Sequence, residues 1–399
     1  MIIENGSIVS PKGFRASGVA CGIKKTSAPD VALIVSEVPA TCAATFTRNL
    51  VKGHSLQMSM RHIEGGLAKA FLINSGNANA CVGPQGDRDA AAAAQRLATR
   101  LDCPVEQILF NSTGVIGIPL PIDKLLEGID RAAASLSGDE AAGHAAEAAI
   151  MTTDTIPKEV TVSFVKDGQT VTVSGMAKGS GMIHPDMATM IGVLTTDCAV
   201  DAAVLQDTLR KAIASTFNRV TIDGDTSVCD MVAVLANGQA GNHRITTPDP
   251  DLMEAFYTVC EALSRMIAKD GEGATKLIEV KVLHARSPED AYRIALSVAK
   301  SPLVKTMIFG EDANWGRILT AVGYAGANFD PAKCDIRIGG LEMCHNGAAV
   351  AFDEEVAKTM LAGDEIPIEI DLNEGTDWDR FWTCDFTYDY VKINGSYRT

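Results

Sequence analysis

The sequence predicts a layered α/β fold with mixed or antiparallel sheets, and neither a Rossmann domain nor a barrel. Helical and strand-like segments are interspersed without the regular βαβ rhythm of a doubly wound sheet. Two alternating segments at 160–165 and 169–174 flank Asp167-Gly168, which is typical of an antiparallel hairpin turn. Phosphate-binding GxGxxG and GxxxxGK[ST] motifs are both absent from the chain.

The remaining elements follow from composition and periodicity. Ala-rich stretches at 89–100 and 139–151 are strong helix formers, and we expect further helices near 201–217, 249–269 and 286–300. Segments rich in β-branched and aromatic residues predict strands. These segments are MVAVLANG (231–238), IEVKVLHA (278–285), CDIRIGG (334–340), IPIEIDL (366–372) and CDFTYDYVKI (384–393).

Composition and charge exclude several classes of protein. The 399 residues are 46% hydrophobic and 21% charged, which suits a globular chain of two or three domains. The net charge of −15 argues against a nucleic-acid or anionic-membrane partner, since both need a basic face. Residues 353–389 carry twelve acidic side chains against Lys358 and Arg380. This segment is either a solvated face or a region that steers a cationic substrate.

Cysteine usage and hydropathy bear on compartment. Ten cysteines occur without a CxxC pair, so we expect buried thiols in a reducing compartment rather than a zinc ribbon. The N-terminal residues lack a signal-peptide pattern, and no apolar run approaches the roughly 20 residues that span a bilayer. A cytoplasmic protein is expected, with a removed transit peptide as the alternative.

Two segments stand out as candidate sites for chemistry. The stretch Met187–Leu194 is apolar except for Thr189, so its hydroxyl is expected to be buried and to need a partner. Alternatively, Thr189 is a strand residue bonded to backbone. The segment NSTGVIG (111–117) offers backbone and hydroxyl donors of the kind that form an oxyanion hole, or it is a turn between a helix and a strand.

Other polar segments are ordinary loops or turns when each is taken alone. They are NSGNANA (74–80), RVTIDGDTSVCD (219–230), DGEGATK (270–276) and GEDANWGR (310–317). We interpret His184, beside Pro185, as structural rather than as a general base. Neither the HExxH zinc motif nor the GxSxG nucleophile elbow is present.

Taken together, these segments resemble the ornithine acetyltransferases, the glutamate N-acetyltransferases of arginine biosynthesis. The matching pieces follow the family order over nearly the whole chain. They are GFRASGVACGIK (13–24), AATFTRN (43–49), NSGNANACVG (74–83), NSTGVIG (111–117), TTDTIPK (152–158), KGSGMIHPDMATM (178–190), LTTD (194–197), DGDTS (223–227), DGEGATK (270–276), GEDANWGRI (310–318) and NGSYRT (394–399).

The resemblance implies a precursor of the self-processing type that cleaves between Ala188 and Thr189. The products would be an α chain, 1–188, and a β chain, 189–399, assembled as a heterotetramer of two of each. The resemblance also implies that Thr113 and Gly114 form the oxyanion hole and that no cofactor or metal is needed. Substrate contacts are implied for Thr152, Lys178, Thr189, Glu272, Asn394 and Thr399. Taken alone, Lys178 would be interpreted as a surface loop lysine and Glu272 as a helix-end or turn carboxylate.

The chemistry of an N-terminal threonine agrees with these roles. Once Thr189 begins a chain, it carries its own α-amine, with a pKa of about 8 in peptides. That amine can take the proton of the Thr189 hydroxyl as it attacks. The implied reaction moves an acetyl group from N-acetyl-L-ornithine to L-glutamate through an acetyl-Thr189 ester, with acetyl-CoA as an optional second donor. Lys178 suits the substrate α-carboxylate, and Glu272 the δ-amine of ornithine.

Two other functions remain open from the sequence. The first is an N-terminal-nucleophile amidohydrolase or aminopeptidase that uses Thr189 but passes the acyl group to water. The second is a metabolite-binding protein in which the bond between Ala188 and Thr189 stays intact.

Overall fold

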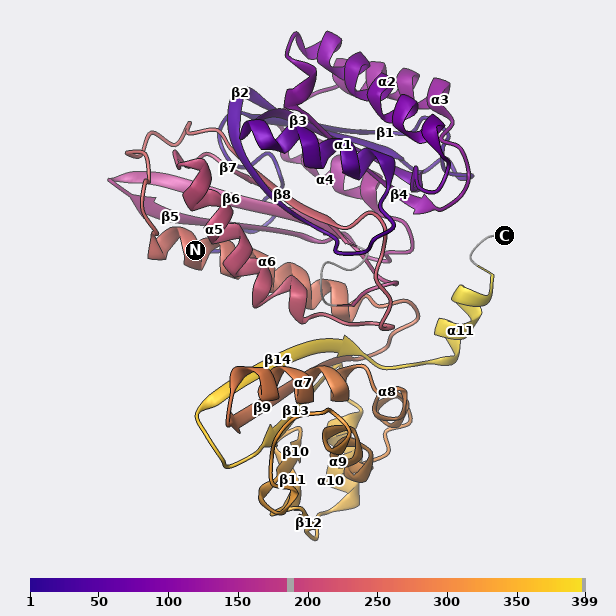
Figure 1. Ribbon diagram of the computed structural model, residues 1–399, viewed down its shortest axis with the longest axis vertical. Helices are drawn as coiled ribbons and strands as arrows, with labels where there is room; N and C mark the ends of the chain where they lie inside the picture. The colour runs from indigo at the N-terminus through magenta and orange to yellow at the C-terminus, as the bar shows by residue number, and fades with distance from the viewer. Residues whose placement is uncertain (185–189, 397–399) are drawn as a thin grey trace. The chain divides into compact units, whose positions relative to one another are not determined.

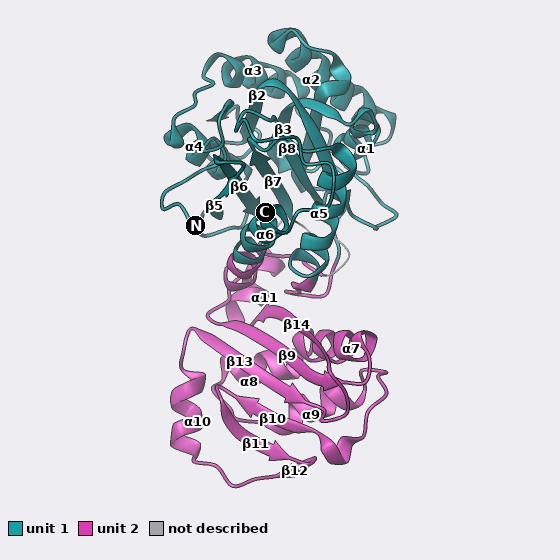
Figure 2. Cartoon of the chain, turned by 90° about the vertical axis from the view of Figure 1, so that its left-hand side faces the viewer, with its two compact units in different colours: residues 1–179, 186–218, 226–263 teal, residues 180–185, 219–225, 264–399 magenta. Residues whose placement is uncertain are grey.

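The computed structural model describes residues 1–184 and 190–396, which form two compact units (Figures 1 and 2). Unit 1 comprises residues 1–179, 186–218 and 226–263, and unit 2 comprises residues 180–185, 219–225 and 264–399. The units interleave along the chain, and they do not test the expected division at 188/189. No described helix is long and apolar enough to cross a membrane.

An open, mixed sheet of eight strands is the centre of unit 1. Its order is β4-β3-β2-β8-β7-β6-β5, with β1 paired to β2. The strands are β1 (Phe14–Val19), β2 (Val31–Phe46), β3 (Leu67–Asn77), β4 (Ile108–Val115), β5 (Glu159–Lys166), β6 (Gln169–Lys178), β7 (Ile191–Thr196) and β8 (Met231–Ala236). β3 pairs parallel with β4 and β7 with β8, while the other neighbours are antiparallel. The predicted mixed sheet is therefore confirmed, and it is neither Rossmann-like nor closed into a barrel.

Alternation along β2 explains why helices cover both faces of this sheet. Val31 and Leu33 pack with the cluster that includes Leu97 and Ile129, whereas Ile34 packs with Ile150 in another cluster. Successive side chains of a strand point to opposite faces, so β2 is buried on both. The helices of this part are α1 (His54–His62), α2 (Pro84–Leu101), α3 (Ile122–Ala134), α4 (Glu140–Ile150), α5 (Ala202–Ala214) and α6 (Pro250–Lys269), the last of which ends in unit 2.

Unit 2 is a six-stranded sheet with the order β12-β11-β10-β13-β9-β14. Its strands are β9 (Leu277–Ala285), β10 (Asp335–Ile338), β11 (Leu341–His345), β12 (Ala348–Ala349), β13 (Glu365–Asp371) and β14 (Asp377–Cys384). Only the β9–β13 pair is parallel. The accompanying helices are α7 (Pro288–Ala299), α8 (Pro302–Phe309), α9 (Trp315–Gly323), α10 (Glu354–Leu361) and α11 (Tyr388–Gly395). In the acidic segment, Glu374 pairs with Arg286 and Asp379 with Arg219, so part of its charge is neutralised locally.

The predicted strand at 384–393 is wrong. Helix α11 begins at Tyr388, within that segment, and continues to Gly395. The Thr387 side chain accepts hydrogen bonds from the backbone N–H groups of Asp389 and Tyr390, which caps the helix. Phe386 and Tyr390 stack with ring centroids 4.8 Å apart. Their aromatic alternation mimics a strand, but the spacing of four residues also suits a helical turn.

Candidate active site

The segment NSTGVIG lies largely in a strand, not in a turn between a helix and a strand. Residues up to Val115 belong to β4, and β3 runs parallel beside them with an irregular register at Gly76 and Asn77. Gly114 has a φ of +133°, and a Cβ there would lie 2.3 Å from the carbonyl carbon of Gly76. Only glycine fits such a close backbone approach. The backbones of Gly114 and Gly76 therefore approach each other closely at the ends of β4 and β3.

Buried polar side chains make hydrogen bonds next to Thr113 and Gly114, at the end of β4. Ser112 Oγ donates to Asn74 Oδ1 over 2.6 Å, and Asn111 Nδ2 donates to the carbonyl oxygen of Cys229 over 2.8 Å. Thr113 itself is only 3% exposed. Because buried polar groups must be paired, the Ser112 bond ties β4 to β3 and the Asn111 bond ties β4 to the segment before β8.

Asp154 joins the predicted residues Thr152 and Lys178. Its Oδ2 accepts from the Thr152 backbone N–H at 2.9 Å, and its Oδ1 accepts from Gly179 N at 2.6 Å and Lys158 Nζ at 2.8 Å. Burial opposes ionisation of this carboxyl, but Lys178 and Lys158 outweigh it and hold the pKa of Asp154 below its usual value. The motifs TTDTIPK and KGSGM therefore meet at one ionised carboxylate.

Lys178 is a buried cation at the end of β6. It is 2% exposed, its backbone pairs with Ile191 of β7, and its side chain makes no hydrogen bond with another described residue. Its charge contributes to lowering the pKa of Lys24, for which burial is the larger cause. Lys24 in turn lies against Gly76, the neighbour of Gly114. The predicted residues Thr113, Gly114, Thr152 and Lys178 thus belong to one connected region of unit 1.

Glu272 and Asn394 are brought together in unit 2. Asn394 Nδ2 donates to Glu272 Oε2 over 2.8 Å, and the Glu272 backbone N–H donates to Ser180 O over 2.7 Å. Glu272 is 8% exposed. A Cβ at Gly181 would lie 2.4 Å from Glu272 Oε2, so the glycine makes room for the carboxylate.

Further acidic groups lie near Glu272. Burial raises the pKa of the Tyr390 hydroxyl, and the charges of Asp223, Glu272 and Asp225 raise it further. Asp223 accepts hydrogen bonds from the backbone N–H groups of Met182 and Ile183 at 2.6 and 2.9 Å. This negative region suits an ammonium ligand.

Three of the predicted site residues, Ala188, Thr189 and Thr399, lie outside the described residues. His184 contacts Thr221 Oγ1 at 3.3 Å through Nδ1.

Sequence reasoning assigned no role to Asp154, Asp223 or Asp230, although each lies in a quoted motif. Asp154 and Asp223 bind backbone N–H groups of the segment around the KGSGM motif, and Asp230 is described further below. An aspartate inside a polar, Gly-rich or Thr-rich motif was the available signal, but its partners are remote in sequence.

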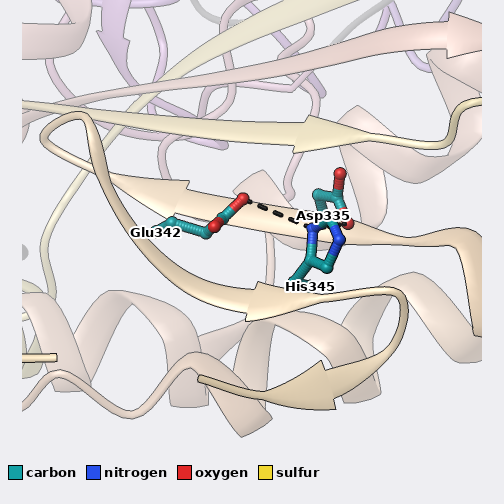
Figure 3. A group of neighbouring side chains, drawn as sticks. All are labelled: Asp335, Glu342 and His345. Atoms are coloured by element: carbon teal, nitrogen blue, oxygen red, sulfur yellow. Dashed lines mark ion pairs between the residues drawn. The ribbon is translucent and has the colours of Figure 1, made fainter. Parts of the chain in front are cut away.

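One group of described residues has ligand types that could hold a metal, namely Asp335, Glu342 and His345 (Figure 3). His345 Nδ1 lies 3.1 Å from Asp335 Oδ1 and 3.6 Å from Glu342 Oε1. Asp335 also accepts from Asn346 N, and Glu342 pairs with Arg337. These ion pairs account for the group, and a metal ion would have to compete with Arg337 for Glu342.

The open mixed sheets, with paired polar residues at the strand ends, define a layered α/β protein. Comparison with known proteins identifies its family. The chain is 50% identical over 406 residues to the arginine biosynthesis bifunctional protein ArgJ of Caldanaerobacter subterraneus, with all of both chains covered. It is 51% identical to the protein of that name from Symbiobacterium thermophilum, with 99% of both chains covered.

A solved chain of ornithine acetyltransferase complexed with ornithine, from Mycobacterium tuberculosis, is 38% identical. Its alignment covers 46% of this chain and 97% of the solved chain, with a TM-score of 0.44. The ArgJ family model matches residues 15–399. The chain belongs to the ArgJ family, and the family resemblance recognised in its motifs is confirmed.

Proposed function

We propose that this protein transfers the acetyl group of N-acetyl-L-ornithine to L-glutamate through an acetyl ester on Thr189. Full-length similarity to proteins named for arginine biosynthesis supports an acetyl-transfer role. The observation that carries the proposal is Lys178, a 2% exposed residue whose charge lowers the pKa of Asp154 but whose side chain makes no hydrogen bond with another described residue. A buried charge without such a partner is costly, and a substrate carboxylate would relieve that cost.

Self-cleavage prepares the nucleophile. The Thr189 hydroxyl oxygen attacks the carbonyl carbon of Ala188, and the C–N bond to Thr189 breaks. The departing nitrogen takes a proton and becomes the α-amine of Thr189, leaving Ala188 as an ester on the hydroxyl oxygen. Water then hydrolyses the ester, which releases the Ala188 carboxylate and restores the hydroxyl. Thr113 and Gly114 stabilise the oxyanion of these steps, and one lost donor in such a hole costs about 3–4 kcal/mol.

Turnover repeats the same chemistry on the substrate. The α-amine of Thr189 takes the hydroxyl proton while the oxygen attacks the acetyl carbonyl, and the ornithine nitrogen leaves with a proton. The amine of glutamate then attacks the acetyl ester, returning the proton to the hydroxyl. Lys178 and Thr152 bind the amino-acid portion common to both substrates. Glu272, with Asn394, accepts hydrogen bonds from the δ-amine. Thr399 is the remaining substrate contact.

Mass spectrometry and an exchange assay test this function together. We expect two chains from purified protein, and N-acetylglutamate from N-acetylornithine only when glutamate is present. Acetate released without glutamate would favour the amidohydrolase instead. An intact, inactive chain that binds the substrates would favour a metabolite-binding protein. Acetyl-CoA, tested as a separate donor, decides whether the ester also forms from a thioester. Native mass spectrometry tests the heterotetramer of two α and two β chains.

A further inference from the structure

Asp230 and Met190 lie side by side at the N-terminal ends of two central strands of the unit 1 sheet, β8 and β7. Asp230 ends the motif DGDTSVCD directly before β8, and Met190 directly precedes β7. The two strands are parallel, with Ile191 opposite Met231. Asp230 Oδ1 accepts a hydrogen bond from Met190 N over 3.2 Å, and Met231 N donates to Met190 O over 3.2 Å. The backbone of Met190 is therefore held on both sides.

The Asp230 side chain is fully buried but incompletely paired. Its exposed fraction is 0%, and its Oδ2 accepts no hydrogen bond of normal geometry from a described residue. The nearby Thr47 hydroxyl donates to the carbonyl oxygen of Ser227 over 3.0 Å, and the Thr47 and Ser227 side chains lower the pKa of Asp230 against the larger opposing effect of burial. Leaving a buried carboxyl oxygen without a partner is unfavourable. Glu147 Oε2 and Glu159 Oε1 share this feature, so the role inferred for Asp230 rests on its hydrogen bond to Met190.

Asp197 lies at the C-terminal end of β7, the other end of the same strand pair. It is a structural cap, and it differs from Asp230 in that both of its carboxyl oxygens are paired. It directly follows β7 and is 1% exposed. Its Oδ1 accepts from Thr172 N over 2.8 Å and its Oδ2 from Lys12 N over 3.1 Å, so both oxygens are paired. Burial raises the pKa of both aspartates, and well above the usual value for Asp230.

We propose that Asp230 is a positioning residue for self-cleavage, and afterwards for the nucleophile, because its carboxyl group holds the amide of Met190. This inference rests on the proposed function. The Met190 amide is the first peptide group after Thr189, so fixing it restricts the backbone that carries the attacking hydroxyl. A displacement of about 1 Å in a reacting group can cost a hundredfold in rate, which makes such a restraint valuable.

Four variants separate positioning from support of the sheet. Asp230→Asn keeps an acceptor for Met190 N in a neutral side chain, whereas Asp230→Leu keeps the branched skeleton, with somewhat larger methyl groups, and removes the acceptor. Asp197→Asn and Asp197→Leu are the matched controls at the other end of the strand pair. Cleavage of newly folded precursor is followed by denaturing electrophoresis and intact mass, only in soluble protein with wild-type circular dichroism. Asp230→Ala is a second variant without an acceptor, should Asp230→Leu fail to fold.

We expect Asp230→Leu to cleave about ten- to a hundredfold more slowly, and Asp230→Asn to stay within about fivefold of wild type. Both Asp197 variants should cleave at the wild-type rate even if they melt earlier. In the cleaved fraction of Asp230→Leu, kcat for acetyl exchange should fall while KM for both substrates changes by less than about twofold. A structural defect would not produce this split.

Wild-type cleavage in Asp230→Leu, or equal slowing in Asp197→Leu, would overturn the inference while leaving the proposed function intact. A wild-type chain that remains uncleaved when active would instead overturn the processing step of the proposed function, and this inference with it.

Discussion

Asn394 donates a hydrogen bond to Glu272 over 2.8 Å, although the two residues are 122 positions apart. Helix α11 carries Asn394, and the Thr387 hydroxyl at its start donates to the carbonyl oxygen of Gly273 over 2.6 Å. Gly273 has a φ of +70°, and a Cβ there would lie 2.6 Å from Tyr390 N. The C-terminal helix is therefore seated directly on the loop that presents the Glu272 carboxylate.

Glu272→Gln should lower kcat/KM for the donor, N-acetylornithine, more than for the acceptor, glutamate. Glutamine keeps the shape of the side chain but removes its charge. Only the ornithine substrate carries a δ-amine that pairs with that charge, so only its binding should weaken. A hydrogen bond to a charged group is worth about 1.5–3 kcal/mol, so kcat/KM for N-acetylornithine should fall about ten- to a hundredfold. Lys178→Met is the comparison and should weaken both substrates. Equal losses for both substrates in Glu272→Gln would assign Glu272 a structural role.

Gly181→Ala tests the same carboxylate by steric means, without removing its charge. The new Cβ would lie 2.4 Å from Glu272 Oε2, so the flexible end of Glu272 must move. We expect a higher KM for N-acetylornithine, a nearly unchanged KM for glutamate and little change in melting temperature. Steady-state kinetics with each substrate varied in turn checks this prediction. An unchanged donor KM would show that the Glu272 position tolerates displacement.

Thr189→Ala should abolish cleavage and acetyl exchange together, because one hydroxyl serves both reactions. Wild-type protein should give chains of 188 and 211 residues, or about 20 and 22 kDa when scaled from the 42.1 kDa chain. Thr189→Ser keeps a hydroxyl and an amine and should retain part of both activities. Intact-mass analysis and the exchange assay provide the readout. Exchange at the wild-type rate in Thr189→Ala would place the nucleophile elsewhere.

Asp154→Asn should destabilise the protein and flatten its acid unfolding limb. The Asp154 and Lys158 side chains are both fully buried, so Asp154→Asn breaks a buried ion pair, at a cost of about 3–5 kcal/mol near neutral pH. The folded pKa of Asp154 is lowered, so its contribution is complete above the unfolded value of about 4. That contribution is lost as the pH falls through the lower folded value.

Denaturant unfolding at a series of pH values measures the Asp154 effect. Asp207, whose carboxylate pairs with Arg210 and Lys211 on the surface of α5, provides the control. Asp207→Asn should leave the midpoint almost unchanged at neutral pH. Equal midpoints for the two variants would contradict the role assigned to the buried Asp154.

Gly114→Ala should be far more harmful than Gly117→Ala, although both glycines have positive φ. A Cβ at Gly114 collides with the backbone of Gly76 at 2.3 Å, whereas a Cβ at Gly117 meets nothing within 4 Å. Gly117→Ala carries only backbone strain of about 1 kcal/mol. Thermal melts and cleavage rates of both variants distinguish these effects. Similar melting temperatures would mean that β3 and β4 separate easily.

Local patterns in the sequence predicted much of the fold because they depend on neighbouring residues. The Asp167-Gly168 hairpin joins β5 to β6, and the Ala-rich stretches lie in α2 and α4. The same local reasoning failed at 384–393, where aromatic alternation suggested a strand and the Thr387 cap begins a helix. It also left open whether NSTG was a turn, because a parallel strand with a glycine corner has no local signature.

Residue identity alone was enough to predict the mixed α/β class, most of the strands and helices, and the family, which eleven motifs in order indicate. The hydrogen bonds of Asp154 with Gly179, of Asn394 with Glu272 and of Asp230 with Met190 become visible only in the folded chain. Each of these bonds joins residues at least 25 positions apart. Their partners depend on which strand and helix ends the packed core brings together, and that packing minimises the cost of burying polar groups over the whole chain.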